Sequence, residues 1–202
     1  VGSDQVWCTI YEDYYLPKVE GVSKISYAAS LGYLPESQVL NEDLIRENLP
    51  CFDSISIREN IHKKYLCELC GVDCEVVLDP TLLFDKEMYL PLINRIKQKR
   101  EEFIFLFYLP HDKQYYKAIE LANRIAREYN VEIVHSLPDV PKNAFARTSK
   151  CMIYEGIEDF LYYIKNAKFV ITNSYHATLF AIQFETPFYT LVVESMRSRI
   201  DT

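Results

Sequence analysis

The sequence lacks any run of 18 consecutive apolar residues, although 49% of its 202 residues are hydrophobic. A helix that crosses a bilayer needs about 20 such residues, so we expect no membrane span. The sequence also lacks the glycine-rich patterns GxGxxG and GxxxxGK[ST], and it contains only five glycines. Dinucleotide sites and Walker-type phosphate sites are therefore unsupported.

A basic face is missing as well. The formal net charge is -7, and acidic residues are in excess in both halves of the chain. Nucleic acid is bound mainly through clustered Lys and Arg, so we expect no nucleic-acid partner. The charged fraction of 25% is that of an ordinary soluble globular protein, and the length suits one large domain or two small ones.

The six cysteines do not make a complete metal site. Cys67, Cys70 and Cys74 form a CxxCxxxC cluster, but no second CxxC and no matched histidine pair accompanies it, and the other three cysteines stand alone. Four-ligand zinc sites need such a second pair. We therefore expect no metal, and reduced thiols in a cytosolic protein.

A strongly patterned stretch is present near the end of the chain, from Lys168 to Ile182. Residues Phe169–Thr172 indicate a buried strand, and the apolar residues from Ala177 onward indicate a buried helix. Ligands of open α/β sheets gather beyond the carboxyl ends of strands, and a helix N-terminus favours phosphate or carboxylate. The polar residues on this turn are the expected centre of chemistry: Asn173, Ser174, Tyr175 and His176.

The imidazole of His176 is the feature of this turn that needs an explanation. Asn173 or Ser174 is expected to cap the helix. A cap does not explain His176, because the helix dipole disfavours a positive charge in the first turn. We interpret His176 as a group that transfers a proton or contacts an anion. The alternative is a histidine packed under a loop and bonded to a carbonyl.

The opening run from Gly2 to Trp7 is small, polar and acidic. Ser3 is placed to bring backbone close to a ligand, and Asp4 to accept a hydrogen bond from a hydroxyl. The alternative is a helix start in which Ser3 or Asp4 caps Gln5 and Trp7 packs inward.

Three arginines are candidates for binding an anion. Arg58 lies where a predicted strand ends and a helix begins, so its guanidinium is placed to fork onto a carboxylate or phosphate. The alternative for Arg58 is an ion pair with Glu59 or a neighbouring acid. Arg197 and Arg199 follow a predicted strand over residues 185–193 and are placed to face the ligand.

The succession of elements predicts an α/β fold. Composition changes from apolar to charged near residue 85, so we expect a partial first domain over residues 1–85 and a second over 86–202. His111 and His135 follow strands of the second domain, so either is placed to border the same cleft, but both are expected as surface or loop histidines. The second domain has a doubly wound pattern, with strands at 103–109 and 131–135, helices at 115–129 and 159–166, and an irregular loop over 138–150.

Four segments together resemble the polysaccharide pyruvyl transferase family. Their order and spacing agree with the family over essentially all 202 residues, and the family often has glycine where this chain has Ala177, a small-for-small change. The segments are Gly2–Trp7, Tyr27–Gly32, Ser56–Glu59 together with Leu78–Leu83, and Thr172–Ala177.

The resemblance implies a fold similar to the glycosyltransferase B type, with two Rossmann-like domains. It implies that this chain is truncated at both ends, without the opening strands of the first domain and the final helix of the second. It also implies phosphoenolpyruvate as co-substrate without any cofactor, and a glycan or lipid-linked sugar of a cell-surface polysaccharide as acceptor. The location implied is the cytoplasm, peripheral to the inner face of the membrane.

The resemblance also assigns roles to residues. His176 is the implied general acid or base, and Asp4 is implied to orient or deprotonate the acceptor hydroxyl. Arg58 is implied to clamp the donor, with Arg197 or Arg199 as the other anion contact and the N–H groups at Ser174 to His176 supporting the phosphate. The expected substrate-binding residues are Ser3, Arg58, Asn173, Ser174, Tyr175, Arg197 and Arg199.

Other activities stay open beside this one. The first is a nucleotide-sugar glycosyltransferase, although no clear acidic ribose ligand follows the predicted strands. The second is a non-catalytic glycan-binding relative that keeps the fold. A serine hydrolase built on Ser174 is poorly supported, because the GxSxG nucleophile elbow is absent.

Overall fold

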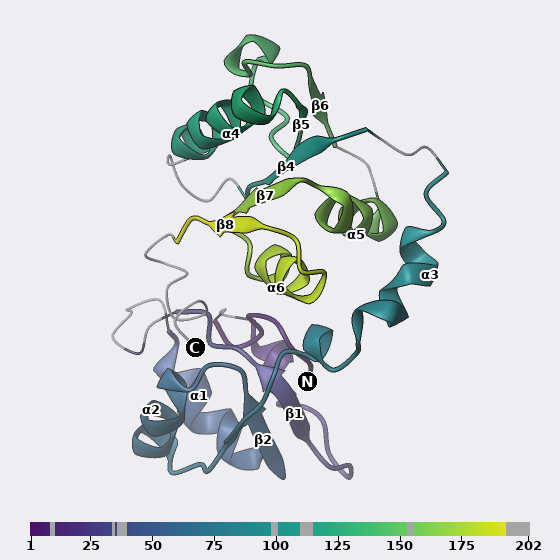
Figure 1. Cartoon of the computed structure of the whole chain (residues 1–202). Helices are drawn as coiled ribbons and strands as arrows, with labels where there is room; N and C mark the ends of the chain where they lie inside the picture. The colour runs from purple at the N-terminus through teal and green to yellow at the C-terminus, as the bar shows by residue number, and fades with distance from the viewer. Residues whose placement is uncertain are drawn as a thin grey trace. The chain divides into compact units, whose positions relative to one another are not determined.

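The computed structural model describes residues 1–8, 11–33, 35, 40–97, 101–109, 115–152 and 156–192. The chain divides into two compact units between Leu83 and Phe84 (Figure 1). Each unit has its own parallel sheet, so the expected α/β class with parallel strands is confirmed. Within the described ranges, no helix combines the length and the apolarity that a membrane crossing requires.

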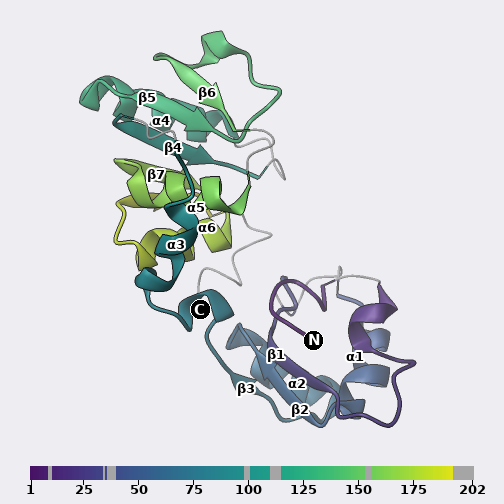
Figure 2. The ribbon, with the colours of Figure 1, turned by 90° about the vertical axis from the view of Figure 1, so that its right-hand side faces the viewer.

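The first unit contains a three-stranded parallel sheet in the order β1-β2-β3 (Figure 2). Residues 1–4 run beside β1, because Val1 exchanges backbone hydrogen bonds with Ile25 and Tyr27, and Asp4 forms a parallel bridge with Ala29. The strands are β1 (Ile25–Ala29), β2 (Ser54–Ile57) and β3 (Glu75–Val76), and the helices are α1 (Glu42–Asn48) and α2 (Ile61–Cys70) with 3-10 turns at Glu12–Tyr15, Leu49–Cys51 and Pro80–Leu82.

Local sequence signals define the start of α1 and the end of α2 in the first unit. The Asn41 side chain accepts from the Leu44 N–H at 3.2 Å and so caps α1. Helix α2 ends at Gly71, whose positive φ of 71° suits glycine in a C-terminal cap. The apolar sides of both helices pack on Ile55 and Ile57 of β2, which gives this unit a core of its own.

The second unit contains a five-stranded parallel sheet in the order β6-β5-β4-β7-β8. Its strands are β4 (Phe103–Phe107), β5 (Glu132–His135), β6 (Ser149–Cys151), β7 (Phe169–Thr172) and β8 (Phe188–Thr190), and its helices are α3 (Leu90–Ile93), α4 (Tyr115–Tyr129), α5 (Ile157–Asn166) and α6 (Tyr175–Gln183), with 3-10 turns at Lys86–Tyr89 and Lys142–Ala144.

The central strand β4 is buried on both faces, as its unbroken run of apolar residues predicts. Ile104 and Leu106 face the core that α4 covers. Phe103 and Phe105 face the opposite core, which α5 and α6 cover (Figure 1). Two helical layers therefore enclose the sheet, and the carboxyl ends of its strands lie along one edge.

Several expected elements are confirmed in this unit, and two expectations need correction. The strand at Phe169–Thr172 and the helix at Tyr115–Tyr129 occur with the expected bounds. The loop expected over 138–150 contains a 3-10 turn and the start of β6, a strand too short to show periodicity. His135 is not a surface histidine, because it ends β5 and is only 4% exposed, stacked on Phe145. His111 lies outside the described residues.

Gly32 follows β1, and both its backbone conformation and the atoms around it disfavour a side chain at this position. Its φ is +73°, and a Cβ built there lies 2.6 Å from Gln5 Nε2 and 3.1 Å from Cys8 Cβ. We expect Gly32→Ala to lower the free energy of unfolding by about 2 kcal/mol, because it adds crowding to the cost of a left-handed alanine. Chemical denaturation measures this difference.

Gly71→Ala is the matched control, since Gly71 has nearly the same φ of +71° but no neighbouring heavy atom within 4 Å of an added Cβ. It is expected to cost about 1 kcal/mol, the conformational part alone. Equal losses in the two variants would show that Gln5 and Cys8 do not constrain position 32.

Candidate functional site

Arg58 lies just beyond the carboxyl end of β2, enclosed by two carboxylates. Its Nε donates to Glu59 Oε1 at 3.1 Å, and its Nη1 donates to Asp79 Oδ2 at 2.9 Å. The Arg58 side chain is only 2% exposed. The ion pair with Glu59, one of the two interpretations of the sequence, is therefore confirmed. An anion clamped by Arg58 has to compete with both carboxylates, so the clamp stays a prediction.

Asp79 joins segments that are far apart in the sequence. Its Oδ2 also accepts from the Ser3 hydroxyl at 2.8 Å, and its Oδ1 accepts from the Thr81 N–H and hydroxyl at 3.0 and 2.8 Å. The Ser3 hydroxyl in turn accepts from Arg58 Nη1 at 3.4 Å. Ser3 is thus held within a polar network of the protein, and its contact with a substrate stays a prediction.

Glu59 links this network to the loop after β1. The Ser30 hydroxyl donates to Glu59 Oε1 at 2.5 Å and accepts from the Gly32 N–H at 3.0 Å. Complete burial by itself raises the pKa of the Glu59 carboxyl. The contact with His62, the charge of Arg58 and the bond from Ser30 outweigh burial and hold the pKa of Glu59 below its ordinary value. Glu59 is therefore an ionised carboxylate at neutral pH.

Asp4 lies at the same edge of the sheet and is exposed. Its Oδ1 accepts from the Gln5 N–H at 2.8 Å and Trp7 is fully buried, as the alternative for this segment expects. The helix start expected there is wrong, because residues 3–8 form turns and bends around a bridge to β1. The φ of 96° at Asp4 is nevertheless unusual for a residue with a side chain. Such strain persists where the surroundings enforce it, and it is concentrated at functional sites. The geometry thus keeps Asp4 as a candidate.

In the second unit, the turn after β7 is held by hydrogen bonds that its own side chains form. The Ser174 hydroxyl accepts from the Ala177 N–H at 3.3 Å, which confirms the expected cap of α6. Asn173 is fully buried, and its amide accepts from the Leu109 N–H at 2.8 Å and donates to the Leu109 carbonyl at 2.9 Å. Asn173 thus ties the end of β7 to the segment after β4, and its role in substrate binding stays a prediction.

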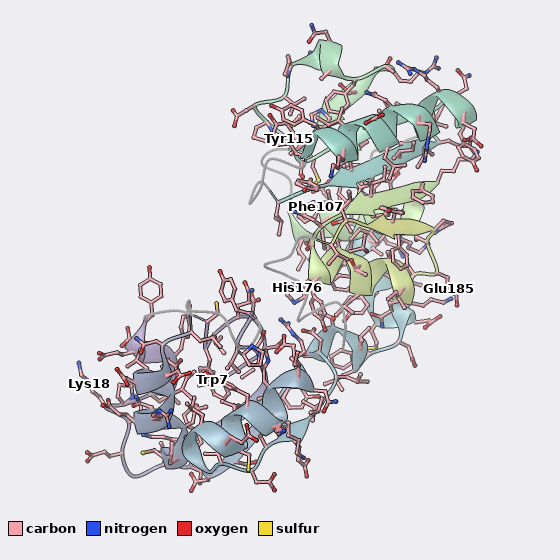
Figure 3. All side chains as sticks on the ribbon, turned by 90° about the vertical axis from the view of Figure 1, so that its left-hand side faces the viewer. Trp7, Lys18, Phe107, Tyr115, His176 and Glu185 are labelled. Atoms are coloured by element: carbon pink, nitrogen blue, oxygen red, sulfur yellow. The ribbon has the colours of Figure 1, made fainter. Side chains whose placement is uncertain are left out.

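His176 and Tyr175 are the partly exposed residues of this turn. They are the first two residues of α6, where the helix dipole places its positive end. The two rings meet edge to face with centroids 5.5 Å apart. Figure 3 labels His176 on the second unit. A partly exposed imidazole beside a helix N-terminus can exchange protons with a bound anionic substrate.

A family model described as polysaccharide pyruvyl transferase matches residues 1–195 of the 202-residue chain. The chain belongs to the polysaccharide pyruvyl transferase family. All four segments on which the resemblance rests lie within the matched range. Arg197 and Arg199 lie beyond it and also outside the described residues. A search of curated proteins found no match.

Among solved structures, this member of the polysaccharide pyruvyl transferase family is similar to UDP-GlcNAc 2-epimerase from Methanocaldococcus jannaschii. The TM-score is 0.55 at 14% sequence identity, and the match covers 89% of this chain and 62% of that chain. The chain therefore spans less than two thirds of the length of the solved protein. At this identity the likeness shows the fold alone, a parallel α/β arrangement.

The structure adds one titratable residue to the network around Arg58 and Glu59. The sequence analysis does not identify this residue. His62 is fully buried in the first turn of α2, with Nδ1 at 3.4 Å from Glu59 Oε2. The spacing of three residues between Glu59 and His62 was a usable signal, because it places both side chains on one side of a helical turn. Among the described residues, no group of three His, Cys, Asp or Glu side chains is arranged to hold a metal ion.

Proposed function

We propose that this chain belongs to an enzyme that transfers the pyruvyl group of phosphoenolpyruvate to a sugar of a cell-surface polysaccharide. The product is a ketal that bridges two sugar hydroxyls, and inorganic phosphate is released. The observation that carries the proposal is the family match over residues 1–195. The proposal includes a two-domain fold of the glycosyltransferase B type, a cytoplasmic location that is peripheral to the membrane, and no cofactor besides the co-substrate.

The reaction needs an acid and a base. A proton added to the methylene carbon of phosphoenolpyruvate makes a methyl group and an oxocarbenium-like centre at the neighbouring carbon. One sugar hydroxyl attacks this carbon, phosphate leaves with its bridging oxygen, and the second hydroxyl completes the ketal. Of the two hydroxyl protons released, one balances the proton taken up by carbon and the other leaves with phosphate. His176 supplies the first proton in this proposal and accepts one from a hydroxyl.

Each candidate group has its own role in this proposal. The N-terminus of α6 supports the donor phosphate next to His176, and the exposed carboxylate of Asp4 orients an acceptor hydroxyl. The two carboxylate partners of Arg58 favour a structural task for this side chain. Through Ser3, Arg58 holds in place the segment from Gly2 to Trp7, which we call the Asp4 loop. Direct clamping of the donor by Arg58 is the alternative.

Calorimetry of the full-length protein tests the choice of donor. We expect phosphoenolpyruvate to bind with a dissociation constant in the micromolar to millimolar range that is usual for enzyme substrates, and UDP-GlcNAc not to bind. Release of phosphate on addition of an oligosaccharide prepared from the cell surface then tests the transfer. Binding of UDP-GlcNAc without binding of phosphoenolpyruvate would overturn the proposed function.

A second candidate function follows from the solved neighbour, which is named as a UDP-GlcNAc 2-epimerase. A nucleotide-sugar enzyme fits the same type of fold. It is the weaker candidate, because the likeness at 14% identity concerns the fold and the family match points to pyruvyl transfer. A non-catalytic glycan-binding relative would bind the oligosaccharide and release no phosphate.

A further inference from the structure

A buried carboxylate and a buried imidazole lie close together next to Arg58. Glu59 and His62 both have fully buried side chains, and Glu59 Oε2 lies 3.4 Å from His62 Nδ1. The other oxygen of Glu59 accepts from Ser30 and from Arg58. A buried ionised carboxylate is stable only if neighbouring groups compensate its charge. The group that faces Oε2 therefore contributes to the stability of the ionised Glu59.

His62 faces hydrogen-bond acceptors on both sides of its ring. Its Nε2 lies 2.5 Å from the Tyr33 carbonyl oxygen, and its Nδ1 faces the Glu59 carboxylate. Both contacts are favourable only when both ring nitrogens carry a proton, which makes the ring a cation. The start of α2 disfavours a positive charge, so the compensation has to come from Glu59.

With a cationic His62, the charges of the four described side chains that are paired here balance. Arg58 and His62 supply two positive charges, and Glu59 and Asp79 supply two negative charges, all on side chains that are at most 2% exposed. The charges of these four side chains and the donor pattern of the ring thus agree on the same state of His62.

The cluster reaches Asp4 through Ser30. The Ser30 hydroxyl is held by Glu59, its N–H donates to the Asp4 carbonyl at 3.0 Å, and its carbonyl accepts from the Trp7 N–H at 3.1 Å. Asp4 has the strained φ of 96°, which only the surrounding contacts maintain. Loss of the Glu59 contact would release Ser30 and with it the Asp4 loop.

We propose that Glu59 and His62 form a buried ion pair that holds the Asp4 loop in its strained conformation, and that both are positioning residues of the transfer reaction. This inference rests on the proposed function for the reaction, but the ion pair itself does not. Neither side chain touches a substrate in the proposal, and both act through Ser30.

Thermal unfolding of Glu59→Gln, His62→Gln and the double variant of the full-length protein tests the ion pair. Each single variant leaves one buried charge uncompensated and is expected to lower the Tm by about 10 °C. The double variant restores electroneutrality and is expected to lose clearly less than the sum of the two. The exposed pair Lys64 and Glu68 on α2 is the control, for which we expect additive effects of about 1 °C each.

Two further measurements separate positioning from stability alone. Nitrogen-15 NMR of the imidazole rings is expected to show two protonated nitrogens for His62 at neutral pH in the parent and one in Glu59→Gln. With phosphoenolpyruvate and the cell-surface oligosaccharide, each single variant is expected to lose at least tenfold in kcat at a temperature where it is folded.

Each result decides a different part of the inference. Additive losses of Tm, or a singly protonated His62 in the parent, would overturn the ion pair. Coupled Tm values with unchanged kcat in both single variants would overturn the positioning role. A parent that releases no phosphate would refute the proposed function, while unfolding and NMR would still decide the ion pair.

Discussion

His176→Asn is expected to reduce the release of phosphate from phosphoenolpyruvate and acceptor by about 10²- to 10⁴-fold, the range that general acid–base catalysis contributes. Asparagine retains a polar side chain of similar size but cannot exchange a proton at neutral pH. His176 is partly exposed, so the substitution is expected to leave the Tm nearly unchanged. Steady-state release of phosphate in the full-length protein measures the effect.

His135→Asn in the same unit is the matched control. The His135 ring is buried on Phe145, its Nδ1 accepts from the Leu137 N–H at 3.3 Å, and burial lowers the pKa of this imidazole. Its replacement is expected to lower the Tm and to leave kcat within about threefold of the parent. If His176→Asn retained full activity, the assignment of the acid would be wrong.

Arg58→Met is expected to lower the free energy of unfolding by about 3 to 5 kcal/mol, because it leaves two buried carboxylates without their shared cation. Glu59 and Asp79 lie 3.1 and 2.9 Å from the guanidinium nitrogens that it removes. Ser3 loses a donor at the same time, so the Asp4 loop is loosened as well. Urea denaturation of the variant and of the parent measures the difference.

Arg58→Lys separates the structural task from the clamp. Lysine retains the charge but cannot reach Glu59 and Asp79 with two nitrogens in a fixed fork, so an intermediate loss of stability is expected. A KM for phosphoenolpyruvate that is unchanged in the folded variant would argue against direct clamping. Arg95→Lys, at an exposed pair with Glu158 in the second unit, is the control and is expected to cost less than about 1 kcal/mol. A similar small loss in Arg58→Met would contradict the buried network.

The strongest patterns in the sequence predicted their elements well. The unbroken apolar run of β4 and the amphipathic spacing of α4 carry enough periodic signal to be recognised alone. The loop predicted over 138–150 overlaps the strand β6 (Ser149–Cys151), because three half-buried residues show no period. Its strand character comes from pairing with β5, a contact between segments that local sequence does not encode.

The candidate residues also differ in whether their contacts are with sequence neighbours or with distant parts of the chain. The cap of α6 by Ser174 and the contact of Asp4 with the Gln5 N–H depend on neighbours within three residues, so the sequence predicted both contacts, although not the turn that replaces the expected helix start. The amide of Asn173 is bonded to Leu109, 64 residues away, and no local pattern indicates that partner. The fully buried state of His62 also depends on Tyr33, which precedes it by 29 residues.

The sequence by itself determined the α/β class, the strand and helix around the turn at Asn173 to His176, and membership of the pyruvyl transferase family, because these depend on periodicity, on capping residues and on motifs that are continuous in the chain. Only the tertiary structure decided that Arg58 is shared between Glu59 and Asp79, since parallel strands bring together residues that end different segments. The physical reason is that burial and charge compensation are properties of the folded surroundings, which a sequence pattern does not contain.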